Sequence, residues 1–212
     1  MPDPLHVSEM LCARLCHDLS GPLGSLLGAT ELAAEQGEGS EAILLAAETA
    51  LTLGRRLRFF RAAWAGDSNS MSVSEIQELA AGIGAGRRVK LDFSGLDPAG
   101  VFAPADARVL LNVVLLAVES IAGDGSVAVA GAAGGEMVVT IDGPRAAWPA
   151  GLAACLADDQ AAWDALTSAR SLQAPLTALI ARRAGLRVSL LLPSGISLGS
   201  APPLLAAPAP KH

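Results

Sequence analysis

Apolar residues recur along the first part of the chain with the period of an α-helix. At about 100° per residue, the apolar positions from Leu11 to Leu26 fall on one side of a helix. Asp3 and Pro4, an acceptor cap and a first-turn proline, predict where this helix begins, and we expect it to end near Gln36. The predicted apolar stripe consists of Leu11, Leu15, Leu19, Pro22, Leu23, Leu26 and Ala33, with Cys12 and Cys16 at its edge.

A second amphipathic helix is predicted over residues 41–64. Residues 37–40 indicate a tight turn, in which Ser40 caps this second helix. Two long helices joined by a short loop form an antiparallel hairpin, which buries each apolar stripe on only one side. Pairing of two hairpins into a four-helix bundle completes the burial, so we expect a homodimer.

The pattern changes to shorter elements after a polar linker at residues 65–70. Ser72 or Ser74 is expected to cap the first helix beyond the linker, and the glycine-rich residues 131–135 indicate a β-hairpin. Periodicity predicts helices over 74–85, 104–121, 148–166 (with a break) and 172–183, and strands over 89–93, 126–130, 136–141 and 187–192, the last clear strand.

These elements predict an α+β protein with two domains. We expect a helical hairpin over residues 1–66 that forms the dimeric four-helix bundle. An α/β sandwich of helices over a mixed sheet follows at 72–198, and an Ala/Pro tail at 199–212 is expected to be disordered.

Composition narrows the class of protein. Of the 212 residues 51% are hydrophobic, yet no uninterrupted apolar run approaches the roughly 20 residues of a membrane span. No basic segment precedes an apolar signal region, so a cytoplasmic protein is expected. A net charge of −6 without a long basic run argues against nucleic acid as a partner. The three cysteines, an odd number, argue against a disulfide framework.

His17 lies opposite the apolar stripe, on a helix face made of glycines. Gly21, Gly24 and Gly28 follow it at i+4, i+7 and i+11 and therefore share its face. A glycine within a helix costs about 1 kcal/mol relative to alanine, so three on one face need a reason. Either another helix packs closely there, or a separate molecule must reach His17 without meeting side chains.

Four arginines gather near the end of the second predicted helix: Arg55, Arg56, Arg58 and Arg61. In an antiparallel hairpin this end lies within a few turns of Arg14 and His17. The arginines either complement the dipole of a solvated helix end or form a positive rim that attracts an acidic partner. If the arginines form such a positive rim, Arg55 and Arg58 are expected to be partner-docking residues together with Gly21, Gly24 and Gly28.

The segment around His17 resembles the H-box of sensor histidine kinases. Residues 17–23 read HDLSGPL, which matches H-D-L-x-x-P-L. In that family the histidine accepts a phosphoryl group and the following acid assists. The order of hairpin and α+β unit is also similar to the dimerisation and ATP-binding domains of these kinases.

The second unit departs from the kinase family at the residues that handle ATP. Residues 108–117 are similar to the N-box, and Asn112 matches its first asparagine, but Leu116 replaces the Mg-coordinating asparagine. Leucine has no oxygen with which to ligate magnesium. Residues 139–144 resemble the adenine-reading strand and aspartate without its second glycine, and 171–176 replaces the glycine-rich lid. We therefore expect a degenerate ATPase-like domain that keeps the fold without the ATP chemistry.

This combination resembles the ChpT family of histidine phosphotransferases over about residues 11–192, most specifically at 11–19. The resemblance implies a dimeric phosphotransferase that receives a phosphoryl group on His17 from the receiver aspartate of a hybrid histidine kinase. It then passes the group to aspartates of response regulators, without ATP. The receiver supplies its own Mg²⁺, so no cofactor or metal is expected on this chain.

Two neighbours of His17 are the other expected catalytic residues. Asp18 is expected to hydrogen-bond the imidazole or hold its tautomer, the alternative being a solvated helix acid. Arg14, one turn earlier on nearly the same face, is expected to meet the phosphoryl oxygens. Gly21 stands where bifunctional kinases carry a polar side chain that orients water, so we expect no strong phosphatase activity.

Other classes of function stay open. Cys12 and Cys16 beside His17 suggest a metal or redox site, but structural zinc takes four ligands and neither Cys155 nor His6 is an obvious completion. Buried, small apolar cysteines explain the pair better. A fragment of an ATP-dependent kinase and a non-catalytic dimeric scaffold are the remaining alternatives, and nucleotide titration separates the kinase from the relay.

Overall fold

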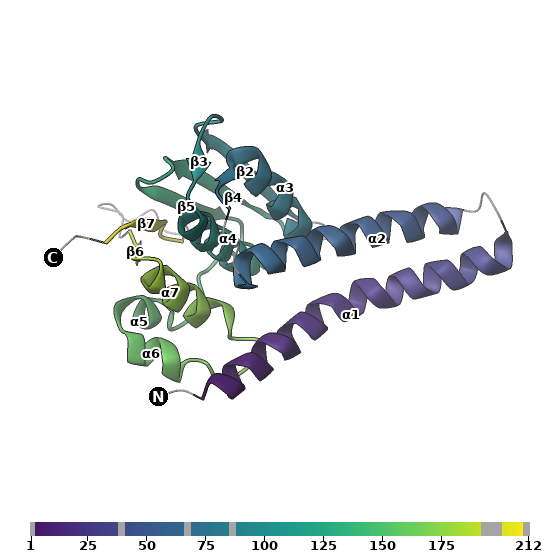
Figure 1. Ribbon diagram of the computed structural model, residues 1–212, viewed down its shortest axis with the longest axis horizontal. Coiled ribbons are helices and arrows are strands. Elements are labelled where there is room, and N and C mark those ends of the chain that lie inside the picture. Colours follow the sequence, from purple (N-terminus) through teal and green to yellow (C-terminus); the bar gives the residue numbers. More distant parts are fainter. Residues whose placement is uncertain (1–2, 38–40, 66–68, 85–87, 192–200, 210–212) are drawn as a thin grey trace.

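A long helical hairpin leads into an α/β sandwich in the computed structural model, which describes residues 3–37, 41–65, 69–84, 88–191 and 201–209 (Figure 1). The hairpin consists of α1 (Pro4–Gln36) and α2 (Glu41–Phe60), and α2 continues into the π-helical turn η1 (Arg61–Ala65). The Asp3 carboxylate accepts a hydrogen bond from the Leu5 amide, which confirms the predicted cap of α1. Ser40 and the predicted domain boundaries at 66 and 198 lie outside the described residues.

The sandwich has one principal sheet with helices packed on it. The sheet order is β2-β4-β5-β7-β6, in which β2 and β4 are parallel and the other neighbours antiparallel. The antiparallel pairing of β4 with β5 confirms the predicted hairpin. The elements are β1 (Met71–Ser72), α3 (Val73–Gly84), β2 (Val89–Leu96), β3 (Val101–Phe102), α4 (Pro104–Glu119), β4 (Gly125–Gly131), β5 (Met137–Asp142), α5 (Leu152–Ala157), α6 (Asp159–Asp164), α7 (Gln173–Arg183), β6 (Leu186–Leu190) and β7 (Leu204–Pro208).

The C-terminal tail corrects the sequence prediction. The tail was predicted to be disordered and 187–192 to be the last strand, but Leu204–Pro208 form β7 and pair with both β5 and β6. Leu204 and Ala206 alternate into the core at 1% and 4% exposure, so this short Ala/Pro segment buries apolar surface as a strand does. Pro208 lies at the end of the strand, where a missing N–H is tolerated.

Helix α4 is the central element of the core. Every side chain from Val109 to Val118 is buried, and the helix packs against η1, α3, α7 and the strands β4 and β5. Helix α3 begins with a reciprocal capping box in which Ser72 Oγ accepts from the Glu75 amide, while the Glu75 carboxylate accepts from the Ser72 amide. Ser72 is therefore the cap.

The apolar stripe of α1 contacts the sandwich along only part of its length. Near its start, Leu11 packs against Met10, Leu166 and Leu172, while Leu23, further along, is 46% exposed. The prediction of buried cysteines is wrong, because Cys12 and Cys16 are exposed. Met10 and Arg14 define the inward face of α1. Cys12 and Cys16 each follow one of these residues by two positions, or about 200° around the helix, so they lie on the opposite side. The buried face is thus rotated relative to the predicted stripe.

Candidate functional site

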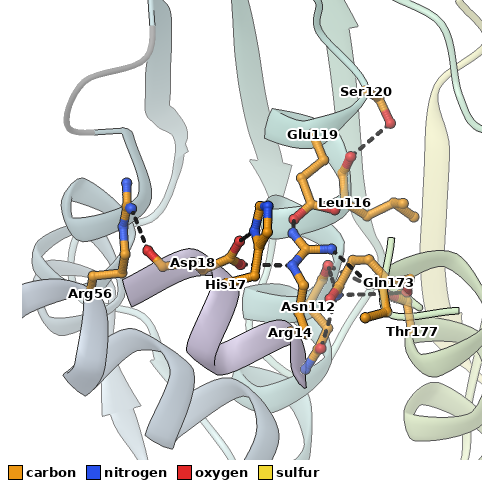
Figure 2. A network of polar contacts seen from close by, with 11 residues as sticks. Arg14, His17, Asp18, Arg56, Asn112, Leu116, Glu119, Ser120, Gln173 and Thr177 are labelled. Atoms are coloured by element: carbon orange, nitrogen blue, oxygen red, sulfur yellow. Dashed lines mark hydrogen bonds and ion pairs between the residues drawn. The ribbon is translucent and has the colours of Figure 1, made fainter. Parts of the chain in front are cut away.

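His17 projects from α1 with its imidazole largely open to solvent. Its side chain is 74% exposed, whereas the neighbouring Asp18 side chain is 17% exposed. His17 Nδ1 lies 3.1 Å from Asp18 Oδ1, as the dashed line in Figure 2 shows. An ionised carboxylate can only accept, so a neutral imidazole in this contact donates from Nδ1–H and keeps its lone pair on Nε2. The arrangement presents a nucleophilic nitrogen on an exposed face.

Arg14 links the Asp18 carboxylate to the α/β sandwich. Arg14 Nε donates to Asp18 Oδ2 at 2.7 Å, and a terminal nitrogen donates to Glu119 Oε1 at the end of α4 (Figure 2). The other terminal nitrogen donates to the Ala169 carbonyl oxygen at 3.3 Å. The sequence prediction placed Arg14 on phosphoryl oxygens; here each of its three side-chain nitrogens has an acceptor within the protein.

The charge of Arg14 is secured by its two carboxylate partners. The residue is only 9% exposed, and burial by itself lowers the pKa of a guanidinium. The charge of Glu119 and the hydrogen bond that Arg14 donates to Asp18 outweigh that burial and raise the pKa of Arg14 above its ordinary value. One guanidinium therefore lies between two carboxylates, one of which is next to His17.

The arginines at the end of α2 contact different neighbours. Arg56 donates to the backbone carbonyl of Asp18 at 3.1 Å, which places this end of α2 beside the histidine as the hairpin prediction required. Arg55 and Arg58 instead line a cavity of about 250 Å³ that also includes Glu75 on α3. Docking of a partner by Arg55 and Arg58 stays a prediction.

The glycine face beside His17 is open. A Cβ atom added at Gly21, Gly24 or Gly28 meets no atom of the described residues within 4 Å. Close packing of another helix of this chain therefore does not explain these glycines within the described structure. The explanations left from the sequence analysis are the approach of a separate molecule and close packing by a helix of a second copy of this chain.

The position of the kinase N-box is filled by structural contacts. Asn112 is fully buried, and its amide donates to the Ala63 carbonyl of η1 at 2.7 Å and accepts from Gln173 Nε2 at 3.1 Å. Leu116 is 1% exposed and belongs to the main hydrophobic core. These two side chains therefore do not fit a magnesium–nucleotide site, because one amide is engaged and the other side chain has no oxygen.

No group of three or more His, Cys, Asp or Glu side chains suited to a metal ion occurs among the described residues. Likewise, no helix in the described parts of the chain is long and apolar enough to cross a membrane.

Sequence reasoning named Arg56 only as one of four arginines near His17, and it did not assign Glu119 to this site. Glu119 ends a helix whose preceding ten residues are all buried. An acidic residue directly after such an apolar run was the signal in the sequence that could have pointed to Glu119. Only the tertiary structure shows that this carboxylate reaches Arg14 on α1.

Comparisons with known proteins agree on one family. Residues 73–194 match the family model of the histidine phosphotransferase C-terminal domain. Protein phosphotransferase ChpT of Brucella abortus (strain 2308) is 26% identical over 193 residues, which cover 88% of this chain and 90% of the relative. A solved structure of a bacterial phosphotransferase aligns with a TM-score of 0.73 and 22% identity, over 97% of this chain and 98% of that one. The similarity to the solved structure is one of fold, and it supports the predicted hairpin and α/β sandwich.

Proposed function

The chain belongs to the histidine phosphotransferase family that includes ChpT, and we propose that His17 is its phosphoryl carrier in a multistep phosphorelay. The proposed donor is the phosphorylated aspartate of a hybrid histidine kinase receiver, and the acceptors are aspartates of response regulators. The observation that carries this proposal is the exposed His17 imidazole, whose Nδ1 contacts Asp18 so that Nε2 faces outward.

The proposed transfer needs positioning and charge neutralisation more than covalent machinery. Nε2 of His17 attacks the phosphorus of the acyl phosphate; the N–P bond forms while the P–O bond to the receiver aspartate breaks and leaves a free carboxylate. The Nδ1 proton stays on the ring, and Asp18 neutralises the positive charge that develops there. Mg²⁺ is proposed to come with the receiver, since this chemistry needs a cation at the acyl phosphate.

We propose that this transfer does not use ATP. The engagement of Asn112 with η1 and Gln173, together with the buried Leu116, supports this part of the proposal. Calorimetric titration with ATP and Mg²⁺ is expected to give no measurable binding. Binding in the micromolar range would instead support the alternative of an ATP-dependent kinase fragment.

Receivers are proposed to dock on the open face of the hairpin. Gly21, Gly24 and Gly28 allow close approach to α1, and Arg55 and Arg58 supply positive charge near the end of α2. Receiver active sites carry acidic residues, so this charge favours their encounter.

A homodimer is proposed because the hairpin leaves several large apolar side chains exposed to solvent. Leu44 and Leu51 lie two turns apart on α2 at 71% and 61% exposure, and Leu27 on α1 is 55% exposed. A second hairpin would cover these side chains in a four-helix bundle. Sedimentation equilibrium is expected to give twice the mass of the chain, and a monomer at micromolar concentration contradicts the bundle.

The decisive experiment for the proposed function is transfer of labelled phosphate without ATP. A phosphorylated receiver from a hybrid kinase is mixed with the wild-type protein or with His17→Gln. We expect an acid-labile, base-stable label on the wild type alone, which is the behaviour of a phosphohistidine. Absence of label from every receiver tried contradicts the relay and favours a kinase fragment or a dimeric scaffold.

A further inference from the structure

We propose that Glu119 is a positioning residue that orients the His17 imidazole through Arg14 and Asp18. The inference rests on the proposed role of His17 as phosphoryl carrier. It starts from a continuous chain of contacts in which Glu119 accepts from Arg14, Arg14 donates to Asp18, and Asp18 contacts His17 Nδ1 (Figure 2).

The two oxygens of the Asp18 carboxylate have separate partners. Oδ2 accepts from Arg14 Nε at 2.7 Å, and Oδ1 lies 3.1 Å from His17 Nδ1. Fixing Oδ2 fixes the plane of the carboxylate, which leaves Oδ1 directed at the imidazole. Asp18 therefore contacts the ring in this way only while Arg14 is itself held in place.

Glu119 is what holds Arg14. An arginine and an aspartate at i and i+4 on an exposed helix face form a weak, mobile pair. Arg14 differs because it is 9% exposed and has Glu119 on its far side, with both carboxylate side chains 17% exposed. A guanidinium with two carboxylate partners in this shielded position is fixed by charge-assisted hydrogen bonds from both sides.

The consequence for the chemistry is the choice of imidazole tautomer. Which ring nitrogen carries the proton depends on the hydrogen bond that the ring makes. With Asp18 accepting from Nδ1–H, the lone pair stays on Nε2 and can form the N–P bond. If the carboxylate turns away, the Nε2–H tautomer becomes populated, and this form has no lone pair on the outward nitrogen.

This chain of contacts assigns a task to the degenerate domain that needs no nucleotide. Glu119 is the last residue of α4, the buried helix of the sandwich, so its position is set by that domain's core. The Asp18 carboxylate that this chain of contacts holds beside the ring also favours the positive charge that develops there during transfer. The sandwich thereby contributes to the reactivity of a histidine on the hairpin.

The test combines Glu119→Gln with two measurements on the full chain. Nitrogen-15 NMR of the imidazole reports the tautomer, and single-turnover transfer from a phosphorylated receiver reports the rate at saturation and the apparent KM. We expect Glu119→Gln to increase the Nε2–H fraction and to slow saturated transfer roughly tenfold, the size typical of losing one hydrogen bond between charged groups. The apparent KM should stay unchanged, because the docking face is not altered.

A matched control removes an ion pair of the same sandwich that does not lead to His17. Asp159→Asn removes the negative charge from the 2.7 Å ion pair between Asp159 Oδ1 and Arg182, and we expect neither the tautomer nor the rate to change. Arg14→Lys keeps a positive charge but cannot bridge two carboxylates, so it should reproduce the tautomer change of Glu119→Gln. This second variant keeps the test decisive if Glu119→Gln folds poorly.

A double-mutant cycle with Asp18→Asn tests whether the effect passes through Asp18. We expect Glu119→Gln to slow transfer in the wild type and to add nothing in the Asp18→Asn background. Unchanged tautomer populations in both Glu119→Gln and Arg14→Lys overturn the inference, as does an equal slowing in both backgrounds. The tautomer is measured on unphosphorylated protein, so failure of the wild type to accept phosphate counts against the proposed function alone.

Discussion

Replacing Gly24 with alanine should stabilise the protein and weaken receiver docking at the same time. Gly24 lies within α1, and an added Cβ meets no atom of the described residues within 4 Å. The methyl group therefore causes no clash, and the helix gains about 1 kcal/mol in the free energy of unfolding. For a chain of this length, that gain raises the unfolding midpoint by about 2–4 °C.

Docking should respond in the opposite direction. If a receiver approaches α1 across the glycine face, each methyl group keeps the two surfaces apart and removes close contacts. We expect the triple variant Gly21→Ala, Gly24→Ala, Gly28→Ala to raise the apparent KM for the phosphorylated receiver by roughly tenfold, which corresponds to about 1.4 kcal/mol of binding free energy. The measurements are urea denaturation for stability and initial phosphotransfer rates over a range of receiver concentrations.

Two other helical glycines provide matched controls. Gly54 in α2 also has no atom within 4 Å of an added Cβ, so Gly54→Ala should stabilise the protein without raising KM. Gly82 in α3 differs, because its added Cβ would lie 2.8 Å from the backbone carbonyl of Arg55, and Gly82→Ala should destabilise. If the triple variant is stabilised and its KM is unchanged, the glycine face has no role in receiver docking. If the triple variant is destabilised, another surface already covers the glycine face of α1.

Two further predictions concern thiols and the cap of α3. Cys12 and Cys16 are exposed, whereas burial raises the pKa of the Cys155 thiol. A thiol reagent should therefore react with two cysteines in the native protein and with three in denaturant. Reaction of only one cysteine in the native protein would mean that another surface covers α1. Ser72→Ala should cost about 1 kcal/mol in urea denaturation. Hydrogen bonds from the backbone and then the hydroxyl of Ser72 lower the pKa of Glu75, so their stabilisation is present above the unfolded-state pKa and is lost as pH falls through the lowered folded-state pKa. The variant should show a shallower acid-side loss of stability; an identical profile contradicts this.

The sequence by itself determined the local features of this protein. The start of α1 at the Asp3 cap and the end of α1 follow from short-range side-chain and backbone hydrogen bonds. The sequence limited the cap of α3 to Ser72 or Ser74, and the structure selects Ser72. Helical periodicity likewise placed His17 and the glycines on one face, because residues three and four positions apart on a helix are neighbours whatever surrounds them. These relations need no knowledge of the rest of the fold.

The tertiary structure decided which surface each face meets. Periodicity shows which residues lie together but not what covers them, so the exposure of Cys12 and the burial of Arg14 depended on where the sandwich packs against α1. The same holds for Glu119, which lies 105 residues from Arg14 in the chain. Strand β7 has too little local signal among alanines and prolines, and it exists because β5 and β6 offer it backbone hydrogen bonds and a buried face.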